Sequence, residues 1–303
     1  SAHFTSTGGN LLPPHDDKTR TFVSIEIDSV GSINIGDPAQ PGYKNFFDNK
    51  VFGIRVFSSD ANIKNNKFTN IGIQKSPFLI KRGVAIEARG TTAGTFNLVV
   101  GGTGVNEANE MDTVSIGIFV IFNYNVDIIN NKIDHSFSDP ILIRFCLLKT
   151  INIIDNEISC RRLAIRSSFN STLSLTIKDN TIDFFGPLTS SNPLRFGILV
   201  EEFGASSLTG ATITNNTING VNSVNRGIIV NNVASPHIEN NTITIIPSFF
   251  AYLRAQGILV TNSFGADIQK NSVVSTDQTE ELIRAIDVQF SPDLVAKCNS
   301  SKD

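Results

Sequence analysis

Apolar and polar residues alternate along most of the chain in short phrases, without helical spacing. One phrase is Gly-apolar-x-apolar, as in Gly53-Ile54-Arg55-Val56. The other is an apolar residue, two residues, Asn, one residue and an apolar residue, as in Ile63-Lys64-Asn65-Asn66-Lys67-Phe68. Because a period of two places alternate side chains on one face of a strand, both phrases predict short β-strands.

The two phrases recur in alternation, and the Gly phrases that begin at Gly197, Gly227 and Gly257 are spaced by 30 residues each. Strands this short cannot bury their inner faces alone, but stacking each coil on the next buries a continuous column of Ile, Val, Leu and Phe. Gly at the corners permits sharp turns. The repeat therefore predicts an all-β solenoid of parallel strands with about nine coils.

One Asn recurs at a fixed position of the second phrase. Stacked coils would place these side chains above one another, where each amide can hydrogen-bond to the next. The predicted Asn ladder consists of Asn66, Asn131, Asn156, Asn180, Asn216, Asn241 and Asn271.

This pattern resembles the right-handed parallel β-helix of the pectin-lyase-like superfamily over about residues 23 to 290. In a longer repeat, Ile33-Asn34-Ile35-Gly36 returns 65 residues later as Leu98-Val99-Val100-Gly101. That repeat is similar to β-helix modules of large secreted bacterial surface proteins exported by the type IX route. The resemblance implies a secreted or cell-surface location. We expect an irregular segment at 1–22, the β-helix at 23–290 and a C-terminal tail at 291–303 of a longer protein.

Composition narrows the choice of partner. Of 303 residues, 17 % are charged and the net charge is −3, which gives no electrostatic reason to expect nucleic acid or an anionic membrane. The apolar runs are far shorter than the ~20 residues of a spanning helix, so membrane insertion is not expected either. With 22 Phe, 3 Tyr and no Trp, a long aromatic-lined sugar groove is disfavoured. Cys146 and Cys160 are predicted to be free, partly buried thiols.

Aligning the Gly phrases predicts which residues share an outward-facing column. We align Arg55, Ala85, Phe119, Leu142, Ala164, Leu199, Ile229, Leu259 and Asp287. This column is apolar from Ala85 to Leu259, and an apolar stripe on the surface of a protein is expected to be covered by other protein atoms. Either a partner subunit or neighbouring domain covers it, with Phe119, Leu142, Leu199, Ile229 and Leu259 as contacts, or the chain's own insertions at 189–195 and 247–254 do.

Two further columns are polar. In the first, we align Arg144, Arg166 and Glu201 as a network of ion pairs, which we prefer to a site for an anionic sugar. The second comes from the other strand and faces either water or carbohydrate. Its residues are Asn62, Asp127, Asn152, Thr176, Thr212, His237 and Asp267.

Two pairs of carboxylates are candidates for catalysis or for metal binding. Asp134 and Asp183 fall two coils apart, roughly 9–10 Å between backbones, near the separation that inverting glycosidases use. With Arg144 and Arg166 they are the catalytic candidates, although exposed Asp at turns is common in any solenoid. Asp155 and Asp179 precede ladder Asn residues on adjacent coils, where they could share Ca²⁺ or simply cap turns. No other cofactor is expected.

Two functions therefore stay open. The first is a non-catalytic module of a secreted or surface-exposed bacterial protein, a stiff scaffold that binds glycans or other surface partners. The alternative is a polysaccharide lyase or glycoside hydrolase that acts on an acidic polysaccharide.

Overall fold

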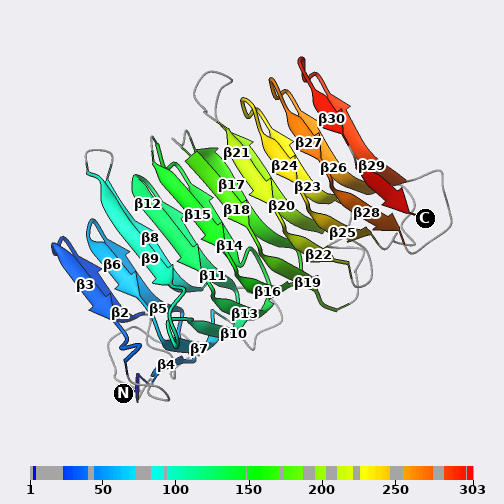
Figure 1. Ribbon diagram of the computed structural model, residues 1–303. Coiled ribbons are helices and arrows are strands. Elements are labelled where there is room, and N and C mark those ends of the chain that lie inside the picture. The colour runs from blue at the N-terminus through cyan, green and yellow to red at the C-terminus, as the bar shows by residue number, and fades with distance from the viewer. Residues whose placement is uncertain are drawn as a thin grey trace, which may run out of the picture.

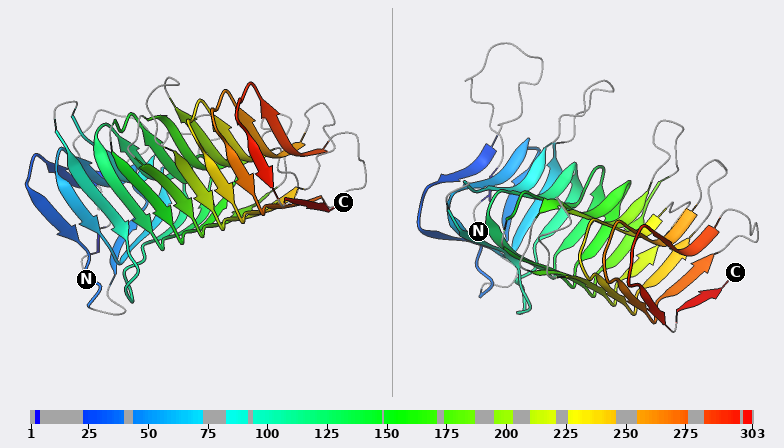
Figure 2. Two further views of the ribbon diagram at one scale, coloured as in Figure 1. Left: turned by 45° about the horizontal axis from the view of Figure 1, so that its top comes forward. Right: turned by 90° about the horizontal axis from the view of Figure 1, so that it is seen from above.

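The computed structural model describes residues 3–4, 23–39, 44–72, 83–91, 94–147, 149–170, 174–186, 195–202, 210–220, 226–245, 255–275, 283–297 and 299–302. These residues form a parallel β-solenoid, as the repeat predicted (Figure 1). No helix that could span a membrane occurs in this described part of the chain. Figure 2 shows that the coils follow one another along a single axis, with the two termini at opposite ends.

Three parallel sheets make up the wall of the solenoid. Sheet A has eleven strands in the described residues: β1 (His3–Phe4), β4 (Asn45–Asp48), β7 (Asn66–Ile71), β10 (Glu110–Val114), β13 (Lys132–Ser136), β16 (Glu157–Cys160), β19 (Thr181–Phe184), β22 (Thr217–Asn219), β25 (Thr242–Ile245), β28 (Ser272–Ser275) and β31 (Ser300–Lys302).

Sheets B and C have ten strands each in the same residues, close to the about nine coils expected. Sheet B contains β2 (Val23–Asp28), β5 (Phe52–Phe57), β8 (Val84–Arg89), β11 (Ile116–Ile121), β14 (Ile141–Arg144), β17 (Leu163–Asn170), β20 (Phe196–Glu202), β23 (Arg226–Asn231), β26 (Ala255–Thr261) and β29 (Ile283–Gln289). Sheet C contains β3 (Ser32–Ile35), β6 (Asp60–Ile63), β9 (Phe96–Gly101), β12 (Tyr124–Ile129), β15 (Thr150–Ile154), β18 (Ser174–Lys178), β21 (Ala211–Thr214), β24 (His237–Glu239), β27 (Asp267–Gln269) and β30 (Val295–Lys297).

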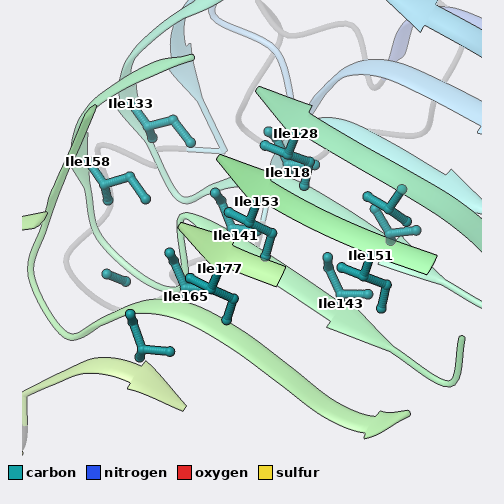
Figure 3. Close-up of a cluster of buried hydrophobic side chains, with 14 of the residues drawn as sticks. Ile118, Ile128, Ile133, Ile141, Ile143, Ile151, Ile153, Ile158, Ile165 and Ile177 are labelled. Carbon is teal, nitrogen blue, oxygen red and sulfur yellow. The ribbon is translucent and has the colours of Figure 1, made fainter. Parts of the chain in front are cut away.

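Alternate side chains of every sheet fill the interior in vertical columns. On sheet C, Ile128, Ile153 and Ile177 lie on consecutive strands and are fully buried. Figure 3 shows these isoleucines packed against the matching columns of sheets A and B. Since burying one such side chain stabilises the fold by about 1.5–3 kcal/mol, the columns explain why the two-residue period persists through the chain.

The Asn ladder is confirmed and is longer than predicted. Consecutive members are joined from side-chain Nδ2 to Oδ1 at 2.9–3.1 Å. From Asn66 to Asn271, each Nδ2 also donates to a backbone carbonyl, as Asn131 does to Val100 O at 2.9 Å. The ladder consists of Asn45, Asn66, Asn109, Asn131, Asn156, Asn180, Asn216, Asn241, Asn271 and Asn299.

The stacking reaches beyond the expected limits of 23–290. Within the expected tail, β30 pairs with β27, and β31 pairs with β28. Within the expected irregular segment, β1 pairs with β4. Asn299 extends the ladder into the last coil, so these strands belong to the same solenoid.

Candidate functional site

The outward column of sheet B differs from the predicted alignment at two strands. Ile86 on β8 pairs with both Ile54 and Ile118, so Glu87, not Ala85, lies in register with Arg55. On β17, Arg166, not Ala164, lies in register with Leu142. The alignment was wrong by two residues at both places, and the continuous apolar stripe is therefore interrupted.

Glu87 and Arg166, the two charged residues that interrupt the stripe, have different ion-pair partners. Glu87 is 1 % exposed and accepts hydrogen bonds from Arg55 Nε at 2.7 Å and Arg89 Nε at 2.6 Å. Arg166 approaches Glu201 at 3.8 Å, as the predicted ion pairs require. Arg144, however, lies in register with Ser168 and not with Arg166, so the three charges do not form one column.

The predicted contact stripe is only partly open to a partner. Leu142, Ile229 and Leu259 are each 6 % exposed, whereas Phe119 and Leu199 are half-buried. Of the insertions expected as cover, 189–194 and 247–254 lie outside the described residues. Contact with a partner through these five residues stays a prediction.

The four catalytic candidates fall on two different faces. Asp134 and Asp183 both face outward on sheet A, with Ser159 on the strand between them, as expected. Arg144 and Arg166 belong to sheet B. The two aspartates therefore lie on the same sheet, two strands apart, whereas the two arginines lie on a neighbouring sheet.

Asp112 was not predicted, yet it lies in register with Asp134 on the next strand. The register between β13 and β16 shifts at Asp134 and His135, and His135 has a left-handed backbone with φ of 52°. This bulge allows His135 Nδ1 to lie 3.0 Å from Asp112 Oδ1. An exposed imidazole next to carboxylates is a group that can transfer protons.

Lys132 balances the charge of this region. Its Nζ lies 3.6 Å from Asp134 Oδ2 and 3.5 Å from Glu157 Oε1. The two carboxylates raise the pKa of Lys132, with Asp134 as the larger cause. The lysine therefore stays charged beside Asp134 at neutral pH.

Asp155 and Asp179 occupy a position that demands a left-handed backbone. Their φ angles are 56° and 57°, and Asn65, Asn130 and Asn215 have 53–57° at the equivalent position. Asn and Asp tolerate this conformation better than other side chains, which accounts for both aspartates without a metal. No cluster of His, Cys, Asp or Glu suited to a metal is found among the described residues, and calcium stays a prediction.

The polar column of sheet C is confirmed in register. Asn62, Asp127, Asn152, Thr176, Thr212, His237 and Asp267 lie on one vertical line, together with Asn34, Val99 and Val295. Neighbours bond along the column, Asn152 Nδ2 donating to Asp127 Oδ1 at 2.7 Å and Asn62 Nδ2 to Asn34 Oδ1 at 3.0 Å. Their outward side chains form a line of donors and acceptors at the strand spacing.

An aromatic ridge at the corner between sheets B and C was not predicted. It consists of Phe122, Phe145 and Phe169, whose rings stack with centroids 5.6 and 5.5 Å apart. Phe122 and Phe145 are each 38 % exposed. All three have left-handed backbones, with φ of 55–62°, a conformation that costs a residue other than Gly about 1 kcal/mol or more.

Among the buried titratable groups, Cys146 and Glu202 lie close to this corner, whereas Cys160 ends β16 on sheet A. Cys146 and Cys160 are free, buried thiols, and burial raises the pKa of Cys146 to about 12. Glu202, at the end of β20, is 2 % exposed, and burial raises its pKa to about 8. At neutral pH these groups are therefore predominantly uncharged.

Comparison of the chain with protein-family models, with curated proteins and with solved structures finds no match.

Proposed function

We propose that the chain is a non-catalytic β-helix module of a secreted or cell-surface bacterial protein, a stiff scaffold that binds a glycan. Stiffness is supported by the close-packed isoleucine columns and the Asn ladder, which join each coil to the next. The resemblance of the repeat to β-helix modules of secreted bacterial surface proteins supports the location.

The polar column of sheet C is the observation on which the proposal rests. Amide, hydroxyl and carboxylate groups follow one another there on consecutive strands. A glycan presents hydroxyl groups at regular intervals, and a regular row of donors and acceptors can bond to several of them together. Many weak contacts at fixed spacing favour an extended ligand over a single sugar.

The test is a glycan array probed with the full chain and with the double variant Asn152→Val, Thr176→Val. Val99 and Val295 already occupy this column, so the variant is expected to fold. We expect the wild type to bind and the variant to lose most of its binding at an unchanged unfolding midpoint. A silent array, or equal binding by the two proteins, would contradict the proposal.

A polysaccharide lyase or glycoside hydrolase is the second candidate, favoured by the contact of His135 with Asp112 beside Asp134. A carboxyl and an imidazole on one face could remove and return a proton on a bound sugar. The assay is turnover of uronate polysaccharides by the wild type and by Asp134→Asn, Asp183→Asn and Asp112→Asn. Loss of a measurable rate in these variants would favour the enzyme, and no turnover by the wild type would remove it.

A further inference from the structure

We propose that the aromatic ridge is the apolar contact of an uncharged, linear glycan that lies along the solenoid axis. This inference rests on the proposed function and locates its binding site on the ridge and on the adjoining start of sheet C. The C–H faces of the sugars would lie along the outward edges of the stacked rings of Phe122, Phe145 and Phe169, and the sugar hydroxyls would reach the polar side chains beside them.

The fold itself does not require phenylalanine at this corner. Ser58, Asn232 and Asn262 hold the same left-handed position on other coils, with φ of 45–57°. Asn and Ser suit that position better than a bulky ring does. Exposed rings on a strained backbone mark interaction sites more often than packing requirements. Two exposed rings in succession, Phe122 and Phe145, with the partly buried Phe169 stacked beside them, therefore point to a ligand.

Polar groups flank the ridge on the coils of Phe122 and Phe145 and on the preceding coil. Asn125 Nδ2 donates to Asn97 Oδ1 at 3.0 Å, and Asn125 Oδ1 accepts from Thr150 N at 3.1 Å. Lys149 Nζ donates to Thr95 Oγ1 at 2.6 Å. An apolar ridge beside amides and hydroxyls fits a pyranose, which has an apolar ring face and a polar rim.

The charge beside the ridge favours an uncharged sugar. Asp127 and Lys149 lie on the coils that carry Phe122 and Phe145, and their charges are opposite. The remaining side chains at the start of sheet C are neutral, namely Asn125 and Thr150 on these coils and Asn97 on the preceding coil. An acidic glycan would therefore gain no net attraction from the sheet C side of the ridge.

The direction of the glycan follows from the ring spacing. The three rings belong to consecutive coils and stack at 5.5–5.6 Å, so the ridge runs parallel to the solenoid axis. A linear glycan along this axis would contact successive rings with successive sugars, whereas a chain across the strands would meet only one ring.

The experiment measures binding of the full chain to cello-, xylo- and N-acetylchito-hexaose, and to an acidic galacturonate hexamer, by isothermal titration calorimetry. The ridge variants are Phe145→Asn and Phe122→Ser, which carry residues found at this position on other coils. The matched control is Phe290→Asn, since Phe290 holds the same position on a distant coil, with φ of 51° and 85 % exposure.

We expect one uncharged hexamer to bind, with about a tenfold or greater loss of affinity in each ridge variant and none in the control. If the ridge variants bind like the wild type, whether or not their unfolding midpoint falls, the proposed role of the ridge in binding is overturned. The proposal that the polar column of sheet C binds a glycan would still stand. Binding of the galacturonate hexamer alone would overturn the inference that the ligand is an uncharged glycan. Absence of binding to all four hexamers would overturn this inference, and a silent glycan array would in addition overturn the proposed function.

Discussion

The buried carboxyl of Glu202 should make the stability of the solenoid depend on pH. Glu202 ends β20 beside Asn170 of β17, and it is 2 % exposed. Neither carboxylate oxygen has a hydrogen-bond partner among the described residues. An ionised carboxylate there would lose its hydration without compensation, and this burial raises the pKa of Glu202 from 4.5 to about 8.

The size of the effect follows from linkage between protonation and folding. The difference between a pKa of about 8 in the folded chain and 4.5 in the unfolded chain is 3.5 units. At 1.36 kcal/mol per unit this corresponds to about 5 kcal/mol. Because the folded state holds the proton more tightly, that stability is fully present below pH 4.5 and is lost as the pH rises to about 8.

The assay is guanidinium unfolding, followed by circular dichroism at fixed pH values from 5 to 9, of the wild type and Glu202→Gln. The variant keeps the size of the side chain and cannot ionise, so its stability should lose most of the pH dependence of the wild type. Glu201→Gln is the control, since Glu201 faces outward with its side chain 33 % exposed. Parallel pH curves for wild type and Glu202→Gln would refute the reasoning.

Three further perturbations test the fold. Asn156→Ala removes the acceptor of Asn131 N and Nδ2 and should cost about 2–4 kcal/mol of unfolding free energy, measured by chemical denaturation; a smaller loss would mean that the ladder is dispensable. Asp155→Val should lower stability by about 1–2 kcal/mol, whereas Asp155→Asn should leave it unchanged, in the same assay. Cys146 and Cys160 should resist a thiol reagent at pH 8 until the chain is unfolded, measured with the third cysteine replaced by serine, because burial raises the pKa of both thiols.

The solenoid was predictable because its two phrases encode both the strand period and the corner. Ladder members Asn45 and Asn109 were missed because the apolar residue three positions earlier is replaced by Gly42 and Asn106. Asn299 was missed because Ser301 replaces the apolar residue that should follow two positions later. Stacking by neighbouring coils keeps these turns in place even where the local phrase is incomplete.

The surface features were harder to predict because they depend on backbone conformation. Phe122 and Phe145 lie within apolar stretches of sequence and look like core residues. Their exposure follows from left-handed turns that place the ring outside the wall. In the same way, the contact of His135 with Asp112 depends on a bulge that no sequence period reveals.

The errors in register have one physical cause. A shift of two residues in the alignment of a strand leaves every side chain on the same face. The alternation of apolar and polar residues is then unchanged, so it cannot distinguish the two registers. Asn66 and its equivalents fix the register of sheets A and C on either side of the ladder, and the outward column predicted on sheet C is confirmed. On sheet A the bulge at Asp134 and His135 interrupts the register. Sheet B lies farther from the ladder, and Ala85 and Ala164 were misaligned by this interval. In a solenoid of this kind, an outward column next to a hydrogen-bonded ladder can therefore be predicted from sequence where no bulge interrupts it. A column elsewhere can be predicted only if a second residue of known register is found in it.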